Sequence, residues 1–215
     1  KKCSIFIHMA SSGVVDNYDN WEKCFAVNVN QSIDLWRQAI KCGIKKFIII
    51  GSCSEYGKNG DNFKKIPVSA SLIPTNAYAA SKAAATMAAI GLAIEHDLDL
   101  KILRLFHVFG EGEDNRRFWQ QLNNAARRNQ DLEMTKGEQV RDFSNVEEIS
   151  KKILSFVSIK GEPGNPSIVN IGSGKSKSLL EFATSEWKSL GAKGKLIVGS
   201  KKYRKNEIMN YVPKL

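Results

Sequence analysis

Two hydrophobic periods alternate along the first half of this 215-residue chain. Short continuous apolar runs occupy residues 4–9, 47–50 and 101–105, and such runs are typical of parallel strands covered on both faces. Between them, apolar residues recur at helical spacing over residues 29–40, and an alanine-rich helix is expected over residues 77–96. Strands that alternate with helices predict an α/β fold with a parallel sheet.

The second half of the chain has a less regular pattern. A helix is expected over residues 118–128, and Ser-x-x-Glu capping boxes that begin at Ser144 and Ser178 indicate two further helix starts. We therefore expect a sheet domain over residues 1–112 and a smaller mixed lobe over residues 113–215 that packs on it.

The formal net charge of +10 raises the question of a nucleic-acid partner. The lysines are scattered as pairs, and no aromatic residues are interleaved with them as single-strand binders require. We expect a solvated basic surface and no nucleic-acid partner. A nucleic-acid-associated scaffold stays open as a rival, and it requires an affinity that falls steeply with salt.

Membrane and redox signals are weak in this sequence. No apolar run approaches the length that crosses a bilayer, so no membrane partner is expected. The four cysteines show neither C-x-x-C spacing nor the density of a disulfide scaffold. We expect a reduced, cytoplasmic protein without a metal site.

Tyr78 and Lys82 carry the first chemical signal. Their spacing of four residues brings both side chains to one face of a helix. Tyrosine has an ordinary pKa near 10, and an adjacent ammonium favours the phenolate. We expect Lys82 to lower the pKa of Tyr78 and to make the phenol useful for acid–base chemistry on an alcohol or ketone. A surface pair on a helix would have the same spacing.

Ser52 carries the second signal, because it follows an expected strand almost directly. Ligands in open α/β sheets bind at the carboxyl ends of strands, so a substrate can reach this hydroxyl. The hydroxyl can donate to a carbonyl or accept from an alcohol. The alternative is a turn serine that satisfies its own backbone.

Further motifs accompany these residues in a fixed order along almost the whole chain. They are I-H-M-A at residues 7–10, N-V at 28–29, S-C-S-E-Y-G at 52–57, Tyr78 with Lys82, L-R-L-F-H-V-F-G at 103–110, R-D-F at 141–143, V-N-I-G-S-G at 169–174 and Y-R-K-N-E at 203–207. In this order the chain resembles the extended short-chain dehydrogenases/reductases, the nucleotide-sugar epimerase/dehydratase group that includes UDP-galactose 4-epimerase-like enzymes.

The resemblance implies a Rossmann-like doubly wound parallel sheet over residues 1–112 and a nucleotide-sugar-binding lobe over residues 113–215. It implies NAD or NADP as cofactor and Ser52, Tyr78 and Lys82 as catalytic residues. The implied cofactor-binding residues are Met9, Ala10, Asn28, Tyr78, Lys82, Leu105 and Phe106. The implied substrate-binding residues are Ser54, His107, Arg141 and Arg204.

The same resemblance implies a role for each residue. Tyr78 exchanges a proton with the sugar hydroxyl, Lys82 holds the nicotinamide ribose, and Ser52 orients the sugar oxygen. Arg141 and Arg204 clamp the diphosphate, since the planar guanidinium suits that task.

Three departures from the family pattern refine this expectation. The glycine-rich turn that binds the cofactor pyrophosphate is absent, so we expect the chain to be N-terminally truncated, with the first strands missing and an open sheet edge that favours a homo-oligomer. Cys53 and Ser54 occupy the places of the dehydratases' Asp-Glu pair, and His107 occupies the place of a usual asparagine. We therefore expect a nucleotide-sugar epimerase or 4-ketoreductase, with a catalytically silent sugar-nucleotide-binding module as the alternative.

Overall fold

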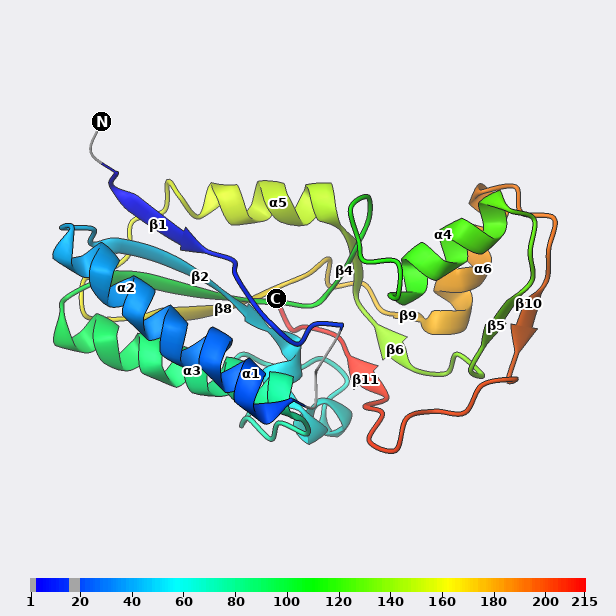
Figure 1. Ribbon diagram of the computed structural model, residues 1–215, viewed down its shortest axis with the longest axis horizontal. Coiled ribbons are helices and arrows are strands. Elements are labelled where there is room, and N and C mark those ends of the chain that lie inside the picture. Colours follow the sequence, from blue (N-terminus) through cyan, green and yellow to red (C-terminus); the bar gives the residue numbers. More distant parts are fainter. Residues whose placement is uncertain (1–2, 16–19) are drawn as a thin grey trace.

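The centre of the protein is a four-stranded parallel sheet. The computed structural model describes residues 3–15 and 20–215, and the strand order of this sheet is β1-β2-β3-β8 (Figure 1). The strands are β1 (Ile5–His8), β2 (Lys46–Ser52), β3 (Asp99–Leu105) and β8 (Ser167–Ile171). Ser52 pairs with Leu105, and Leu105 pairs with Ile171, so the carboxyl ends of three strands meet at one edge.

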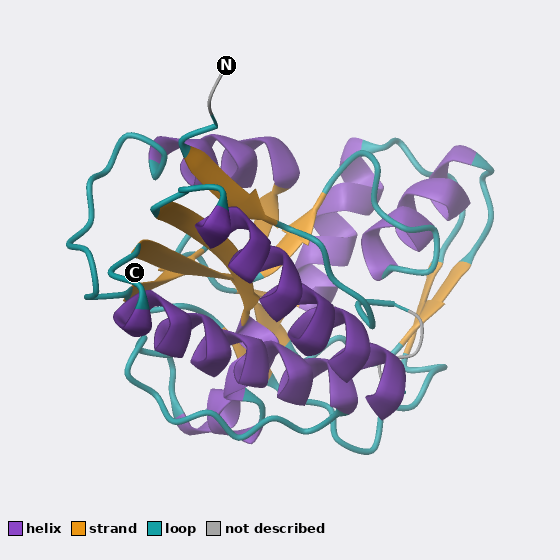
Figure 2. Cartoon of the chain, turned by 60° about the vertical axis from the view of Figure 1, so that its left-hand side comes forward, coloured by secondary structure: helices purple, strands orange, loops and turns teal. Residues whose placement is uncertain are grey.

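Helices cover both faces of this sheet. On one face, α2 (Ser32–Lys41) and α3 (Ala77–Glu95) pack against Phe47 and Ile49. On the other, α5 (Val146–Ser155) packs against Ile48. Successive side chains of a strand point to opposite faces, which explains why the whole β2 run is apolar. Figures 1 and 2 show the three layers, and the expected α/β fold with a doubly wound parallel sheet is confirmed.

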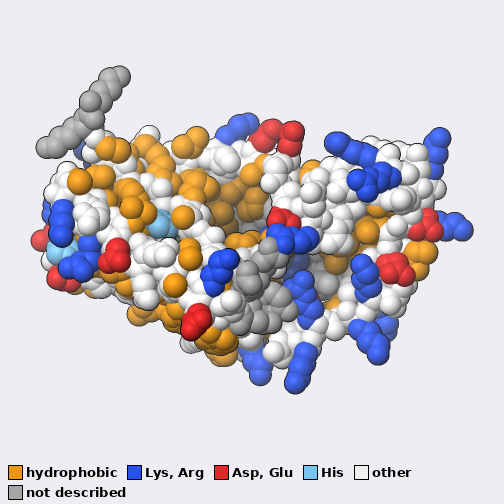
Figure 3. All heavy atoms as spheres, in the orientation of Figure 1, with side chains coloured by type: hydrophobic (Ala, Val, Ile, Leu, Met, Phe, Trp, Pro, Cys, Tyr) orange, Lys and Arg blue, Asp and Glu red, His pale blue; other side chains and the backbone are white. Residues whose placement is uncertain are grey.

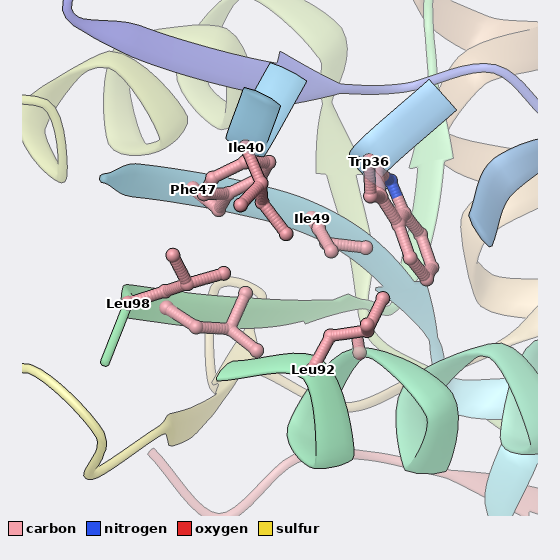
Figure 4. A pocket seen from close by; sticks show the side chains of 8 residues that line it. Trp36, Ile40, Phe47, Ile49, Leu92 and Leu98 are labelled. Atoms are coloured by element: carbon pink, nitrogen blue, oxygen red, sulfur yellow. The ribbon is translucent and has the colours of Figure 1, made fainter. Parts of the chain in front are cut away.

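A small apolar gap remains between α2, α3 and the sheet (Figure 4). Trp36 and Ile40 reach it from α2, Leu92 reaches it from α3, and Phe47 and Ile49 reach it from β2. Among the described residues, those that line the gap are all apolar apart from the indole nitrogen of Trp36. We assign it to the hydrophobic core.

The helix expected over residues 29–40 is longer and less regular than its pattern indicated. It comprises α1 (Trp21–Phe25), the π-helical segment η1 (Ala26–Gln31) and α2. Asn20 caps its start, because the Asn20 side chain accepts a hydrogen bond from the Lys23 amide. The π-helical turn places Asn28 in the interior, which matters for the site described below.

The smaller lobe, on the right in Figure 1, has its own core around Leu122 and Trp187. Its elements are β4 (His107–Phe109), α4 (Phe118–Arg127), β5 (Leu132–Met134), β6 (Val140–Arg141), β7 (Phe143–Asn145), β9 (Lys177–Ser178), α6 (Leu179–Ser189), β10 (Leu196–Val198) and β11 (Asn210–Tyr211). Here β4 pairs with β7, β5 pairs with β10, and β6 lies between β9 and β11.

The structure corrects one helix start and refines the division of the chain. The capping box at Ser178 is confirmed, but the one at Ser144 is wrong, because Asn145 caps α5 and the Ser144 hydroxyl instead donates to Asp142. In addition, β8 and α5 come from the second half of the sequence but belong to the sheet layers. The division near residue 112 into a cofactor-binding part and a substrate-binding part therefore stays a prediction.

The expectation that no apolar segment is long enough to cross a bilayer is wrong for helix α3. Its 19 residues have a mean hydropathy of 1.3 over an 18-residue window, which meets that criterion by length and composition. Half of this window is buried in the protein, where alanines pack against the sheet. The apolarity of α3 is thus explained in part by core packing.

Candidate active site

The loop after β2 presents Ser52 at the carboxyl edge of the sheet. Ser52 caps the short 3₁₀ helix η2 (Cys53–Tyr56), and its Oγ accepts a hydrogen bond of 3.2 Å from the Ser54 amide. This bond uses an acceptor position and leaves the hydroxyl proton available for donation. Gly57 ends the loop with φ +51°, where a Cβ would lie 1.8 Å from the Ile73 carbonyl oxygen, so only glycine fits. The loop is followed by a second 3₁₀ helix, η3 (Lys58–Asn62).

The start of α3 places Tyr78 and Lys82 beside this loop. The Asn76 side chain caps the helix by accepting 2.8 Å from the Ala79 amide. Lys82 is buried, and its Nζ donates to the Ile50 carbonyl oxygen of β2 at 2.6 Å. Burial lowers the pKa of Lys82, and Glu55 acts in the opposite direction. Since an ammonium has three donors, the bond to Ile50 leaves two for a ligand such as a ribose diol.

The pKa of Tyr78 differs from the expectation. It is raised above the ordinary tyrosine value, because burial outweighs hydrogen bonding to Ser52 and Ser11, which lowers it. The expectation that Lys82 lowers the pKa of Tyr78 is therefore wrong in direction, because burial is the largest effect. The phenol is therefore protonated at neutral pH, and the hydrogen bonding links it with Ser52.

Cys53 and Ser54, the replacements for a carboxyl pair, cannot supply acid–base chemistry near neutral pH. Burial raises the pKa of the Cys53 thiol to about 12. The Ser54 backbone is held in the η2 turn, where its carbonyl oxygen accepts from the Gly57 amide. Tyr78 is the group next to Ser52 whose hydroxyl is linked with it by hydrogen bonding.

Asn28, which the resemblance implies as a cofactor-binding residue, lies buried in η1, and its side chain has protein partners. Its Oδ1 accepts 2.7 Å from the Ser12 amide, and its Nδ2 donates 2.9 Å to the Ser12 carbonyl oxygen and 2.9 Å to the Ser81 hydroxyl. The Ser81 hydroxyl in turn donates to the Tyr78 carbonyl oxygen. Asn28 therefore ties the segment after β1 to the turn of α3 that carries Tyr78.

The remaining residues implied for the cofactor differ in exposure. Met9 and Ala10 follow β1 at the same edge and are exposed. Leu105 is partly buried at the end of β3, and Phe106 is buried against Tyr56. Of these four residues, Met9 and Ala10 are accessible to a ligand, whereas Phe106 packs against Tyr56 in the loop after β2.

A buried polar network under the loop was missed at the level of sequence. Glu55 is fully buried and forms an ion pair of 2.9 Å with Arg104. Arg104 also donates to the Tyr56 hydroxyl, which donates 2.6 Å to Asn170 on β8. Gly51 is the local signal for this network, because a Cβ there would lie 2.7 Å from Glu55 Oε1.

His107 borders an aromatic-lined pocket in the smaller lobe. The pocket lies between β4, β7, α4 and α6, and Phe109, Phe143 and Phe182 contribute to its lining. Burial, and then Arg141 and Arg117, hold the pKa of His107 well below its usual value, so the ring is neutral. Its Nδ1 is buried without a hydrogen-bond partner among the described residues. The ring can therefore serve a ligand that reaches this pocket.

Arg141 and Arg204, the two expected diphosphate ligands, both contact Glu207. Arg141 is buried and pairs with Glu207 at 2.9 Å, and it also donates to the Ile208 carbonyl oxygen. Arg204 is exposed, and its carbonyl oxygen accepts from the Glu207 amide. Arg141 therefore already has a carboxylate partner inside the protein, and Arg204 differs from it in being exposed to solvent.

The R-D-F and G-S-G motifs meet through Asp142. Its buried carboxylate accepts 2.9 Å from the Ser173 amide and 2.7 Å from the Ser144 hydroxyl. Gly172 permits this approach, since a Cβ there would lie 2.9 Å from Asp142 Oδ2. The R-D-F motif thus has a structural role, because Asp142 joins the smaller lobe to the end of β8.

No group of three or more His, Cys, Asp or Glu side chains that could hold a metal occurs in residues 3–15 and 20–215.

A parallel sheet with helices on both faces carries Ser52 at the carboxyl end of β2, and Tyr78 and Lys82 lie beside it on α3. The chain belongs to the NAD dependent epimerase/dehydratase family, whose model matches residues 1–172.

Two curated relatives match at low identity. The CDP-abequose synthase of Salmonella typhimurium is 27% identical over 117 residues, which cover 53% of this chain and 39% of the relative. The dTDP-D-glucose 4,6-dehydratase of Mus musculus is 27% identical over 185 residues, which cover 85% and 51%. The matches therefore span about two fifths and one half of these relatives.

Solved structures share the fold. The UDP-glucose 4-epimerase of Thermotoga maritima, solved with UDP-glucose, superposes with a TM-score of 0.89 at 22% identity and covers 98% of this chain and 68% of its own. MoeE5, solved in complex with UDP-glucuronic acid and NAD, superposes with a TM-score of 0.88 at 23% identity and covers 100% and 71%.

Proposed function

We propose that this chain is part of a nicotinamide-dependent nucleotide-sugar 4-ketoreductase or epimerase, in which hydride is transferred at a sugar carbon and Tyr78 exchanges a proton with the oxygen on that carbon. The observation that carries the proposal is the convergence of Ser52, Tyr78 and Lys82 at the carboxyl end of β2. Family membership supports the reaction class, since this family is NAD-dependent. The mechanism needs no metal ligand or disulfide from this chain.

Tyr78 and Ser52 handle the substrate oxygen in this proposal. In reduction, the Tyr78 phenol donates its proton to the carbonyl oxygen, and Ser52 donates a hydrogen bond that orients that oxygen. In epimerisation, the phenolate first accepts the hydroxyl proton. The raised pKa of Tyr78 favours the reductive direction, because the protonated phenol is the form that reduction consumes.

Lys82 and the exposed residues after β1 offer a place for the cofactor. The two unused donors of Lys82 suit ribose hydroxyls, and Met9 and Ala10 leave the edge beside β1 open. A nicotinamide group supplies or removes hydride when bound. Neighbouring folds solved with NAD support this assignment, and NAD and NADP both remain candidates.

The smaller lobe is the proposed place for the nucleotide diphosphate. Lys and Arg side chains gather over this lobe, as Figure 3 shows. We assign the exposed Arg204 and the buried Arg141 to the diphosphate, and His107 and Ser54 to the substrate as well. The UDP-sugars bound in similar structures support this substrate class. We propose no nucleic-acid partner.

We further propose a soluble, cytoplasmic homo-oligomer that associates through α3. Met87 and Ile94 are 61% and 58% exposed on this helix, and each lies about one turn from the exposed Gly91. Large exposed side chains on an uncharged helix stripe are typical of a protein interface. A second copy would cover them.

Turnover assays test the proposed reaction in purified protein that also includes a glycine-rich turn for the cofactor pyrophosphate ahead of β1. UDP-, dTDP- and CDP-hexoses with NAD test epimerisation, and their 4-keto derivatives with NADH or NADPH test reduction. Turnover of either kind supports the proposal. Nucleoside-diphosphate binding without turnover would instead support the catalytically silent binding module, and the absence of both would refute the two candidates together.

A further inference from the structure

The buried carboxylate of Glu55 connects the two halves of the candidate active site. Its Oε1 accepts 2.8 Å from the backbone amide of Ser52, at the end of β2. Its Oε2 accepts 2.9 Å from the hydroxyl of Thr86 on α3. Thr86 lies four residues after Lys82, hence on the same side of α3. One side chain thus bonds to both elements that carry the reacting groups.

Arg104 fixes the carboxylate from behind. Its Nε donates 2.9 Å to Glu55 Oε2, and both side chains are almost completely buried. A buried charge needs a paired and hydrogen-bonded partner, and Arg104 satisfies that need from β3. Arg104 is fixed in turn by the Tyr56 hydroxyl and therefore by Asn170 on β8. The position of Glu55 is set by three strands and one helix.

We propose that Glu55 is a positioning residue that sets the Ser52 hydroxyl against the Tyr78 phenol. The proposal rests on the proposed proton exchange at Tyr78. Glu55 acts through its neighbours, since its carboxylate oxygens are already bonded to the Ser52 amide, Thr86 and Arg104. Small changes in its geometry move a catalytic hydroxyl, and misplacement on the scale of 1 Å costs about a hundredfold in rate.

The charge of Glu55 reaches the same groups. It raises the pKa of Tyr78 and of Cys53, although burial is the larger cause for both. It also acts to raise the pKa of Lys82 against the effect of burial. Lys82 faces His8 as well, whose pKa it helps to lower. Removing the carboxylate charge should therefore lower the pKa of Tyr78, which a purely structural role does not require.

Glu55→Gln is the direct test in the purified protein. We expect kcat to fall by about ten- to a hundredfold with KM for the nucleotide sugar nearly unchanged. We also expect the alkaline limb of the pH profile to move to lower pH. Because this variant leaves Arg104 without a counter-charge, Thr86→Val provides a second test that removes only the bond to α3. Thr86→Val should lower kcat without moving the alkaline limb of the pH profile. Thr86→Ser keeps the hydroxyl and should retain most of the parent's kcat.

Asp99→Asn is the matched control. Asp99 lies at the amino end of β3, pairs with Lys101 at 2.6 Å, and is remote from the candidate site. Its loss should reduce stability and leave the pH profile unchanged. An unchanged kcat and pH profile in both Glu55→Gln and Thr86→Val would overturn the proposal.

A titration of Tyr78 separates this proposal from the proposed function. The ring carbon that bears the phenol oxygen can be followed by NMR in protein with ¹³C-labelled tyrosine, without any substrate. A lower midpoint in Glu55→Gln than in the parent supports the role of Glu55 even if no nucleotide sugar is turned over. An equal midpoint in the two folded proteins would overturn it even if the parent is active.

Discussion

Arg141 and Glu207 form a partly buried ion pair of 2.9 Å that joins β6 to the turn that carries Arg204. The Arg141 guanidinium also lies 5.2 Å from the ring centre of Tyr211 on β11. Burial lowers the pKa of Arg141, and Glu207 opposes that effect. Arg141 therefore organises the segment from which Arg204 extends, in addition to any contact of its own with a diphosphate.

The two arginines should differ in their effects. Arg204→Ala should weaken nucleoside-diphosphate binding by about 1.5–3 kcal/mol, the range for a charge-assisted hydrogen bond. It should change the unfolding free energy little, because interactions of an exposed charge contribute little to stability. Arg141→Ala should weaken binding similarly and also reduce the unfolding free energy, because Glu207 loses its partner. Calorimetry and denaturant titration measure the two quantities.

The control for this pair is Arg127→Ala, which removes an exposed charge at the end of α4. It should change neither quantity appreciably. Equal diphosphate affinity in Arg204→Ala and in the parent would remove Arg204 from the site.

Asn28→Ala should destabilise the protein. The change deletes the bonds to Ser12 and Ser81 and leaves buried partners unsatisfied, at a cost of about 1–3 kcal/mol. Denaturant titration measures the unfolding free energy. Asn30→Ala, an exposed neighbour in the same π-helical segment, should have almost no effect. Equal losses in the two variants would contradict the bridging role of Asn28.

The pH dependence of reduction follows from the pKa of Tyr78. That pKa is raised by burial, and the protonated phenol is the acid that reduction requires. Reduction should therefore persist through neutral pH and decline only as pH rises through this raised value. A profile of kcat/KM against pH measures it. A rate that rises with pH through the neutral range would indicate that the phenolate is the active form.

The association proposal is tested by Met87→Lys on α3. A charge in the middle of the exposed stripe should convert an oligomer to a monomer, because its burial in an interface is unfavourable. Light scattering measures the molar mass in solution. Leu154→Lys, which changes a residue 60% exposed on α5, is the matched control and should leave the mass unchanged.

Much of this fold could be predicted from local pattern. The continuous apolar run of β2 and the alanines of α3 follow from burial between layers, which leaves a strong signal in a single sequence. The pairing of β8 with β3 could not be predicted in the same way, since it joins segments far apart in the chain. Short strands such as β6, with two residues, have no period of their own.

The candidate site shows the same division. The spacing of Tyr78 and Lys82 and the position of Ser52 after a strand were visible in the sequence. Burial was not visible, and it reverses the expected direction of the Tyr78 pKa and gives Arg141 a protein partner. Glu55 carries no signal except the motif around it, because its role depends on bonds to three separate elements.

The central claim is that Tyr78 exchanges the proton with the sugar oxygen, and Tyr78→Phe tests it most directly. With a 4-keto nucleotide sugar and reduced nicotinamide cofactor, the loss of nicotinamide absorbance measures turnover. We predict a decrease of about a hundred- to ten-thousandfold, the range for a general acid–base group, with nucleoside-diphosphate affinity nearly unchanged. Turnover by Tyr78→Phe within about threefold of the parent, far outside that range, would contradict the account.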